Sequence, residues 1–288
     1  MLRWTLYFML ATVCGASVIL AQASELSAPD QVTAGQPATI HSDVSGSLIV
    51  VGPGKVFRRS IKAGEDAILK PEEIRNAGLY ILSIGGASKS FFVTPGPAKR
   101  LSFLARPSRV PVAQHDVISG TAFVFDEYEN LVTAPAGVKF DLTVRNVSNF
   151  SRTVMSRDGV AYVLTASGPR EGAAQFVASL GDGDVPVRRV VQQVASDPCG
   201  IHMMAQKEES AILLETSPIR DCSGNAIPDG TIVTFTSIEE GGSRSQVDAR
   251  IRKGIAKAQL PVPASRALLQ VAAGVVVGNE IRWEGDKR

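Results

Sequence analysis

The chain has 288 residues, of which 44% are hydrophobic, so its length and composition fit two or three folded domains and exclude large-scale disorder. Its 30 Lys and Arg residues against 28 Asp and Glu leave a net charge of +2. That balance is too small to indicate nucleic acid or an anionic membrane surface as the partner.

The N-terminal segment has the features of a secretory signal. Arg3 is its one charge, residues 6–20 form an uncharged apolar run, and Ala21-Gln22-Ala23 supplies the small residues that a signal peptidase prefers. We therefore expect residues 1–23 to be a cleaved signal peptide. A retained membrane anchor is the alternative, because the uncharged run is almost long enough to span a bilayer.

Residues 24–95 are expected to form a first domain that ends in a hairpin. A strand at residues 78–84, a turn at Gly85-Gly86 and a strand at residues 89–94 carry this signal. Tyr80 could be the tyrosine-corner residue of an immunoglobulin-like sandwich, or it could simply pack in the core.

The rest of the chain contains a repeat. The stretch DEYENLVTAPAGVKF begins at Asp126, and DCSGNAIPDGTIVTF begins 95 positions later at Asp221. The same offset aligns Asn130 with Asn225, Phe140 with Phe235 and Gly159 with Gly254. The repeat predicts two related domains, residues 96–195 and 196–288, joined by short proline-containing linkers.

Both repeats have the pattern of strands. Residues 138–145 alternate apolar and polar side chains, as a half-buried strand does, and Gly or Pro recurs about every 8–12 residues. The Asp- and Asn-containing stretches read as turns that precede a core strand. We therefore expect an all-β chain of three tandem immunoglobulin-like β-sandwich domains after the signal peptide.

Cys199 and Cys222 are the two cysteines that remain after removal of the signal. An even pair in an exported chain predicts a disulfide, and closing a loop of 23 residues stabilises a fold by roughly 3 kcal/mol. The alternative is a metal-binding or catalytic thiol, for which His202 is the only candidate partner close in sequence.

The repeated stretches, with Arg157-Asp158-Gly159-Val160-Ala161 in one and Arg252-Lys253-Gly254-Ile255-Ala256 in the other, resemble bacterial Ig-like repeats of invasin and intimin type. The resemblance is strongest over residues 105–288. It implies spacer, adhesive or docking modules outside the cytoplasm, without chemistry of their own.

Candidate chemistry is sparse. His41, His115 and His202 fall one to each expected domain, and no nucleophile or phosphate-binding motif accompanies them, so we expect no enzyme activity and no cofactor. The run His202-Met203-Met204 has ligands that suit Cu(I), although a core strand explains the methionines equally simply.

Two acidic groups are candidate Ca²⁺ ligands: Asp182 with Asp184, and a cluster of Asp126, Glu127 and Glu129. Asp-Gly is also a common hairpin turn that needs no metal. The basic pairs Arg58-Arg59 and Arg188-Arg189 are expected on solvated strand edges, where charge discourages unwanted pairing.

These features predict a non-catalytic structural or interaction subunit of a bacterial envelope or extracellular assembly. Its partners would be proteins, bound through sheet edges or end loops, in the periplasm or outside the cell. The alternative is a surface adhesin or glycan-binding module that contacts a glycan or a host surface. The sequence does not indicate which residues bind.

Overall fold

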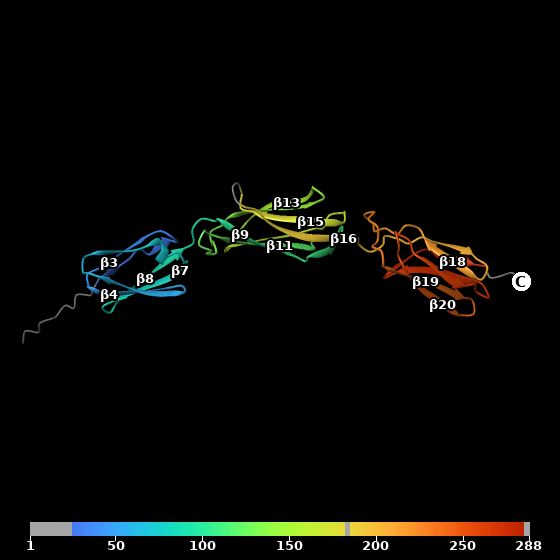
Figure 1. Cartoon of the computed structure of the whole chain (residues 1–288), viewed down its shortest axis with the longest axis horizontal. Helices are drawn as coiled ribbons and strands as arrows, with labels where there is room; N and C mark the ends of the chain where they lie inside the picture. The colour runs from blue at the N-terminus through green and yellow to red at the C-terminus, as the bar shows by residue number, and fades with distance from the viewer. Residues whose placement is uncertain (1–24, 182–184, 285–288) are drawn as a thin grey trace, which may run out of the picture. The chain divides into compact units, whose positions relative to one another are not determined.

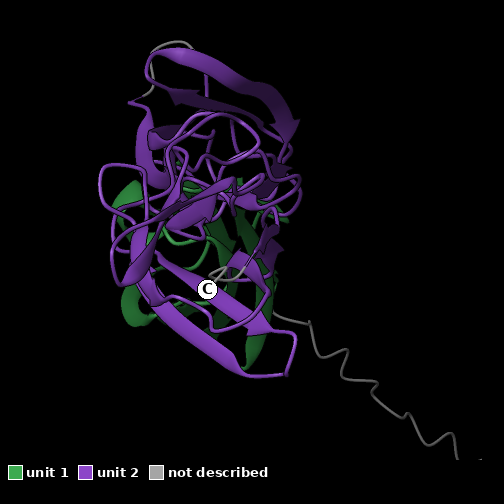
Figure 2. Cartoon of the chain, turned by 90° about the vertical axis from the view of Figure 1, so that its right-hand side faces the viewer, with its two compact units in different colours: residues 1–94 green, residues 95–288 purple. Residues whose placement is uncertain are grey.

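The computed structural model describes residues 25–181 and 185–284. The expected signal peptide and the candidate ligands Asp182 and Asp184 lie outside the described residues. The chain divides into two compact units, residues 1–94 and 95–288 (Figure 2). Within the described part of the chain, no helix has the length and apolar character needed to cross a membrane.

Unit 1 contains two sheets (Figure 1). The smaller sheet has the order β1 (Leu26–Ser27), β3 (Ala38–Ser42), β6 (Asp66–Leu69). The larger has the order β2 (Gln31–Thr33), β8 (Ala87–Thr94), β7 (Gly78–Ile84), β4 (Gly46–Gly52), β5 (Lys55–Ile61). Only the β2–β8 pair among these is parallel. Between the sheets lies a core that includes Ile40, Leu48, Tyr80, Leu82 and Phe91.

The first half of unit 2 repeats this arrangement. Its smaller sheet has the order β14 (Val160–Thr165), β11 (Ile118–Phe125), β9 (Arg100–Arg106). Its larger sheet has the order β10 (Arg109–Pro111), β16 (Val187–Val194), β15 (Gly172–Ser179), β12 (Gly137–Val144), β13 (Val147–Met155). The rings of Phe103, Phe140 and Phe176 meet in the core, with centroids 5.1–6.2 Å apart.

The second half of unit 2 has the same plan and a separate core around Phe235. The smaller sheet has the order β17 (Met203–Lys207), β18 (Ala211–Thr216), β21 (Lys257–Pro261). In the larger sheet, β20 (Arg244–Arg250) pairs with β19 (Ile232–Glu239), which pairs with β22 (Ala267–Ala273). The short strands β23 (Val276–Val277) and β24 (Ile281–Trp283) both pair with β22.

The predicted all-β immunoglobulin-like sandwich fold is confirmed. Strand β12 shows how the sequence produces it: Val138, Phe140 and Leu142 are fully buried, while Lys139 and Asp141 between them face outward. We propose that each pair of sheets is one domain, with the bounds 24–95, 96–195 and 196–288 expected from the sequence.

Tyr80 forms a tyrosine corner. Its ring is buried and stacked on Phe91 with centroids 5.3 Å apart, and its hydroxyl donates a hydrogen bond to the Asn76 carbonyl at 3.1 Å. Burial raises the pKa of the Tyr80 hydroxyl, and the hydrogen bond to Asn76 offsets this only in part. Gly52 faces the same ring so closely that a Cβ at residue 52 would overlap Tyr80.

Tyr80→Phe is expected to lower the free energy of unfolding of unit 1 by about 1–2 kcal/mol, because the partly buried Asn76 carbonyl loses its donor while packing is kept. Urea unfolding of the full chain measures this. Ser90→Ala, at an exposed position on the neighbouring strand β8, should change stability by less than about 0.5 kcal/mol. Equal stabilities for the Tyr80 variant and the parent would contradict the corner.

Candidate functional site

Asp126 opens the first copy of the repeated stretch, and its carboxylate is almost fully buried. Oδ1 accepts hydrogen bonds from the backbone N–H groups of Tyr128 at 2.9 Å and Asn130 at 2.8 Å. Oδ2 accepts from the backbone N–H of Gly96 and from the Asn130 side-chain amide, both at 2.8 Å. A carboxylate offers about four acceptor positions, so these donors fill them all.

This network bears on the candidate Ca²⁺ ligands Asp126, Glu127 and Glu129. The four hydrogen bonds leave the Asp126 carboxylate no acceptor position for a cation. The Glu129 carboxylate pairs with the Arg100 guanidinium, with N and O 3.4 Å apart. The carboxylate of Asp126 therefore fastens the start of the domain to the loop before β12.

Asp221 makes the same network in the second copy. Its Oδ1 accepts from the backbone N–H groups of Ser223 at 2.9 Å and Asn225 at 2.8 Å. Its Oδ2 accepts from the Ser196 N–H at 3.1 Å and the Asn225 side-chain amide at 2.9 Å. The repeated spacing of Asp and Asn in the sequence thus corresponds to the same buried hydrogen-bond network in both sandwiches of unit 2.

The two carboxyl groups share an electrostatic character. Burial by itself would raise the pKa of each, but the hydrogen bonds donated to the ionised form outweigh it. The net result is that the pKa values of Asp126 and Asp221 are both lowered from the ordinary aspartate value.

The Asp221 loop also ties the two sandwiches of unit 2 together. The Asn225 amide donates to the Pro169 carbonyl at 2.9 Å, and the Ser196 hydroxyl donates to the Val112 carbonyl at 2.6 Å. A disulfide joins Cys199 to Cys222, with Cα atoms 4.6 Å apart, so the predicted pairing is confirmed. We call this set of contacts the joint of unit 2.

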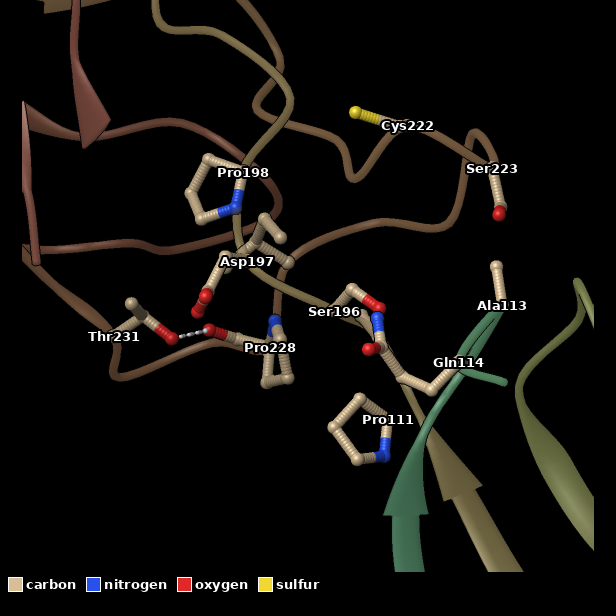
Figure 3. Close-up of a pocket in the computed structure, with 12 residues that line it drawn as sticks. Pro111, Ala113, Gln114, Ser196, Asp197, Pro198, Cys222, Ser223, Pro228 and Thr231 are labelled. Atoms are coloured by element: carbon tan, nitrogen blue, oxygen red, sulfur yellow. Dashed lines mark hydrogen bonds between the residues drawn. The ribbon is translucent and has the colours of Figure 1, made fainter. Parts of the chain in front are cut away.

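A cavity of about 590 Å³ opens at the joint (Figure 3). Residues from both sandwiches line it, among them Pro111 and Gln114 on one side and Asp197 and Thr231 on the other. Among the described lining residues, Asp197 is the one carboxylate and there is no histidine, so the lining does not supply the pair of groups that general acid–base catalysis uses. We interpret the cavity as a consequence of the joint.

The histidines are dispersed. His41 lies at the surface of unit 1, where Nδ1 is 2.9 Å from Asp66 and Nε2 is 3.4 Å from Asp43. The hydrogen bond with Asp66 raises the pKa of His41 despite the opposing effect of burial. Over residues 25–181 and 185–284, no three His, Cys, Asp or Glu side chains are grouped so that they could hold a metal ion.

The candidate copper ligands do not face one another. Met203 is buried in the core of the second sandwich of unit 2, whereas Met204 is half exposed, because successive side chains of a strand point to opposite faces. The core-strand explanation therefore holds for Met203.

The prediction of a solvated pair at Arg58-Arg59 is wrong for Arg59. Its guanidinium binds both oxygens of Glu73, at 2.6 and 2.7 Å, and also donates to the Ile68 carbonyl. The sequence could not show this because Glu73 lies in a separate turn, η1 (Pro71–Glu73). Arg58, Arg188 and Arg189 are exposed, as expected.

A different feature of unit 1 was missed. The outer face of its five-stranded sheet carries an apolar surface, here called the unit 1 face, formed by Val51, Val56, Leu79, Ile81 and Phe92. These side chains are 40–65% exposed. Val51 stands opposite both Val56 and Ile81 in the sheet, and Leu79 stands opposite Phe92, so the surface is continuous across four strands.

The equivalent faces of unit 2 carry more charged residues. Outward positions of β12 carry Lys139 and Asp141, and those of β20 carry Arg244, Asp248 and Arg250. Among the outward positions of β4, β5, β7 and β8, the one charged residue is Arg58. Since all three sheets share one fold, the fold itself does not require an apolar face, and the unit 1 face is a specific property of this unit.

A signal for this surface is present in the sequence. Residues 48–51 (LIVV), 79–82 (LYIL) and 91–93 (FFV) are consecutive apolar runs rather than alternating ones. In an antiparallel sheet such runs place apolar side chains on both faces. The second and third of these runs fall within the strands expected at residues 78–84 and 89–94.

Comparison with known proteins gives the class of the fold. No family model matches the chain, and no curated protein matches it in sequence. Among solved structures, the Escherichia coli adhesin FdeC is similar over 90% of this chain and 96% of its own, at 13% identity and a TM-score of 0.58. Invasin, a bacterial integrin-binding protein, is similar over 91% of this chain and 60% of its own, at 13% identity and a TM-score of 0.54.

The resemblance to bacterial Ig-like repeats of invasin type is therefore confirmed for the fold. It also extends further than expected, because matches over 90% of the chain include unit 1 as well as residues 105–288.

Proposed function

We propose that this chain is an exported, non-catalytic recognition protein of the bacterial envelope or an extracellular assembly. It binds a protein partner through the unit 1 face. The observation that carries this proposal is the exposure of five large apolar side chains, joined in one patch, on a sheet face whose counterparts in unit 2 include charged residues on β12 and β20. Exposed apolar patches on soluble domains commonly mark interaction sites.

The chemistry of the face favours a protein over a glycan. Four of its five side chains are aliphatic, and the neighbouring outward residues are mainly serines, including Ser60, Ser83 and Ser90. Aliphatic side chains bury area well but do not hydrogen-bond sugar hydroxyls. A complementary apolar protein surface gains the most from covering them.

The joint of unit 2 supports a role in positioning. The disulfide, the buried Asp221 network and the Asn225–Pro169 bond restrain the path of the chain between two sandwiches. A spacer needs such a restraint between its domains, whereas an enzyme would need reactive groups at a cleft.

A surface adhesin is the second candidate function. The likeness of the fold to FdeC and invasin favours it, since both are described as adhesive or integrin-binding proteins. The two candidates differ in the partner: an assembly subunit binds a fixed partner of its own cell, whereas an adhesin binds a foreign surface.

Ile81→Lys, at the centre of the unit 1 face, is expected to weaken partner binding by on the order of tenfold or more, because it places a charge in the apolar contact. Affinity purification of the tagged full chain from its own bacterium, with quantitative mass spectrometry, measures the loss. The matched control is Gln246→Lys, at an outward position of β20 in unit 2.

Thermal unfolding must first show that both variants keep the parent stability. A partner that is retained equally by the parent, the Ile81 variant and the Gln246 variant would contradict binding through the unit 1 face. Recovery of free chain without a partner, together with binding to foreign cells that Ile81→Lys abolishes, would establish the adhesin instead.

A further inference from the structure

The disulfide of unit 2 lies at the surface. Both Cys199 and Cys222 are exposed, although cysteine is among the residue types most often buried. Gly200 comes directly after Cys199, and Gly224 stands two positions after Cys222. A Cβ atom built on either glycine would meet no atom within 4 Å beyond the adjoining residues. The two segments beside the bond are therefore open to solvent.

The cavity at the joint gives a reagent room beside one of the two cysteines. Cys222 and Ser223 border this cavity of about 590 Å³, together with Pro111 and Ala113 of the first sandwich of unit 2 (Figure 3). Thiol–disulfide exchange begins when a thiolate reaches a disulfide sulfur, so access decides whether the exchange occurs in a folded chain. Exposed disulfides are accordingly the labile ones.

The two segments that carry the cysteines are also held together without the bond. The Cys199 N–H donates to the Arg220 carbonyl at 2.9 Å, and Pro198 forms an antiparallel bridge with Asp221. The Ser196 N–H donates to the Asp221 carboxylate at 3.1 Å. These contacts keep the two sulfurs near each other after the bond opens, so that exchange with a disulfide reagent can close it again.

We propose that the Cys199–Cys222 bond is a thiol–disulfide exchange site of the folded chain, that its substrate class is a dithiol, and that its reduction loosens the joint. One thiolate of the dithiol bonds to one cysteine sulfur, the bond between the cysteines breaks, and the other cysteine leaves as a thiolate that takes up a proton. The second thiol of the dithiol then displaces the attached cysteine and closes a disulfide within the reagent. Two electrons and two protons thereby pass from the dithiol to the two cysteines.

Opening the bond acts on both segments that tie the two sandwiches of unit 2 together. Asn225, three residues after Cys222, donates to the Pro169 carbonyl at 2.9 Å. In the other segment, the Ser196 hydroxyl donates to the Val112 carbonyl at 2.6 Å. Reduction removes the covalent restraint between these segments and leaves their hydrogen bonds. The reduced chain thus keeps its sandwiches and has a looser joint, and this effect is independent of the unit 1 face.

Reduction kinetics of the full exported chain with dithiothreitol test the proposal. Free thiols are alkylated at each time and counted by intact-mass analysis, in native buffer and in urea. The rate for the folded chain is expected to rise linearly with dithiothreitol concentration, with a second-order rate constant within about a hundredfold of the value in urea. A constant lower than that, or a rate that stops rising because unfolding limits it, would overturn the proposal.

Val271→Ala separates direct exchange from exchange through unfolding. Val271 is buried on β22 in the core of the same sandwich, so its truncation raises the unfolded fraction without changing the segments that carry the cysteines. Once thermal unfolding shows that the variant is folded, its rate constant in native buffer is expected to equal that of the parent. A rate constant that rises in proportion to the unfolded fraction would show that exchange needs unfolding.

Amide hydrogen exchange tests the effect on the joint. In the reduced parent, exchange at residues 223–225 is expected to accelerate, whereas exchange in β12 of the first sandwich of unit 2 should stay as in the oxidised parent. Equal exchange of residues 223–225 in the two forms would contradict a looser joint.

Discussion

Asp221→Asn is expected to lower the free energy of unfolding of the second sandwich of unit 2 by about 3 kcal/mol at neutral pH. Asparagine keeps the size of the side chain but removes the charge. Its amide NH2 group also replaces one carboxylate oxygen, so it faces backbone N–H donors that it cannot accept a hydrogen bond from. Denaturant unfolding of the full chain measures the loss. Asp248→Asn, at an exposed position of the same sandwich, is the matched control and should have little effect.

The same network predicts a pH dependence. Because the pKa values of Asp126 and Asp221 are lowered in the folded state, the unfolded chain binds protons more readily. Their stabilisation is present above the unfolded aspartate pKa of about 3.9 and is lost as the pH falls through the lower folded values. The parent should therefore lose stability below about pH 4, and Asp221→Asn should lose less over that range. Parallel pH profiles for the two proteins would contradict this role.

Removal of the disulfide is expected to have a similarly large effect. The double variant Cys199→Ser, Cys222→Ser frees a loop with a sequence separation of 23 residues, which should cost about 3 kcal/mol in the unfolding of the second sandwich of unit 2. Unfolding of the parent with and without a reductant gives the same comparison without mutation.

The disulfide variant also tests the joint. Cys199 lies just beyond the linker residue Ser196, and Cys222 lies beside Asp221, so the bond and the carboxylate network restrain the same two segments. Amide hydrogen exchange of these segments should accelerate in the double variant, while unit 1 should exchange as in the parent. Unchanged unfolding midpoints on reduction would show that the bond contributes nothing to this part of the fold.

Local patterns in the sequence predicted much of the fold. The alternation in residues 138–145 correctly indicated a strand, and the repeat around Asp126 and Asp221 correctly indicated turns before core strands. The Cys199–Cys222 pairing followed from cysteine number alone. These features depend on a few neighbouring residues or on a single possible pair.

The remainder depends on contacts between distant segments. The Asn225 side chain donates a hydrogen bond to the Pro169 carbonyl, 56 residues away, and Arg59 on β5 binds Glu73 in the turn η1. No local sequence pattern identifies either partner. The unit 1 face was missed for a different reason. A run of apolar residues such as 48–51 is compatible with a strand buried on both sides, and only the sheet arrangement shows that one side is exposed.

The central feature of the proposed function is contact between the unit 1 face and a protein partner. A photoreactive amino acid placed at Phe92 in the full chain, expressed in its native cell, tests this directly. The account predicts a covalent adduct with one protein, or with a foreign surface protein if the chain is an adhesin, and no such adduct from the same group at Gln246. Absence of any protein adduct at Phe92, or the same adducts from both positions, would contradict it.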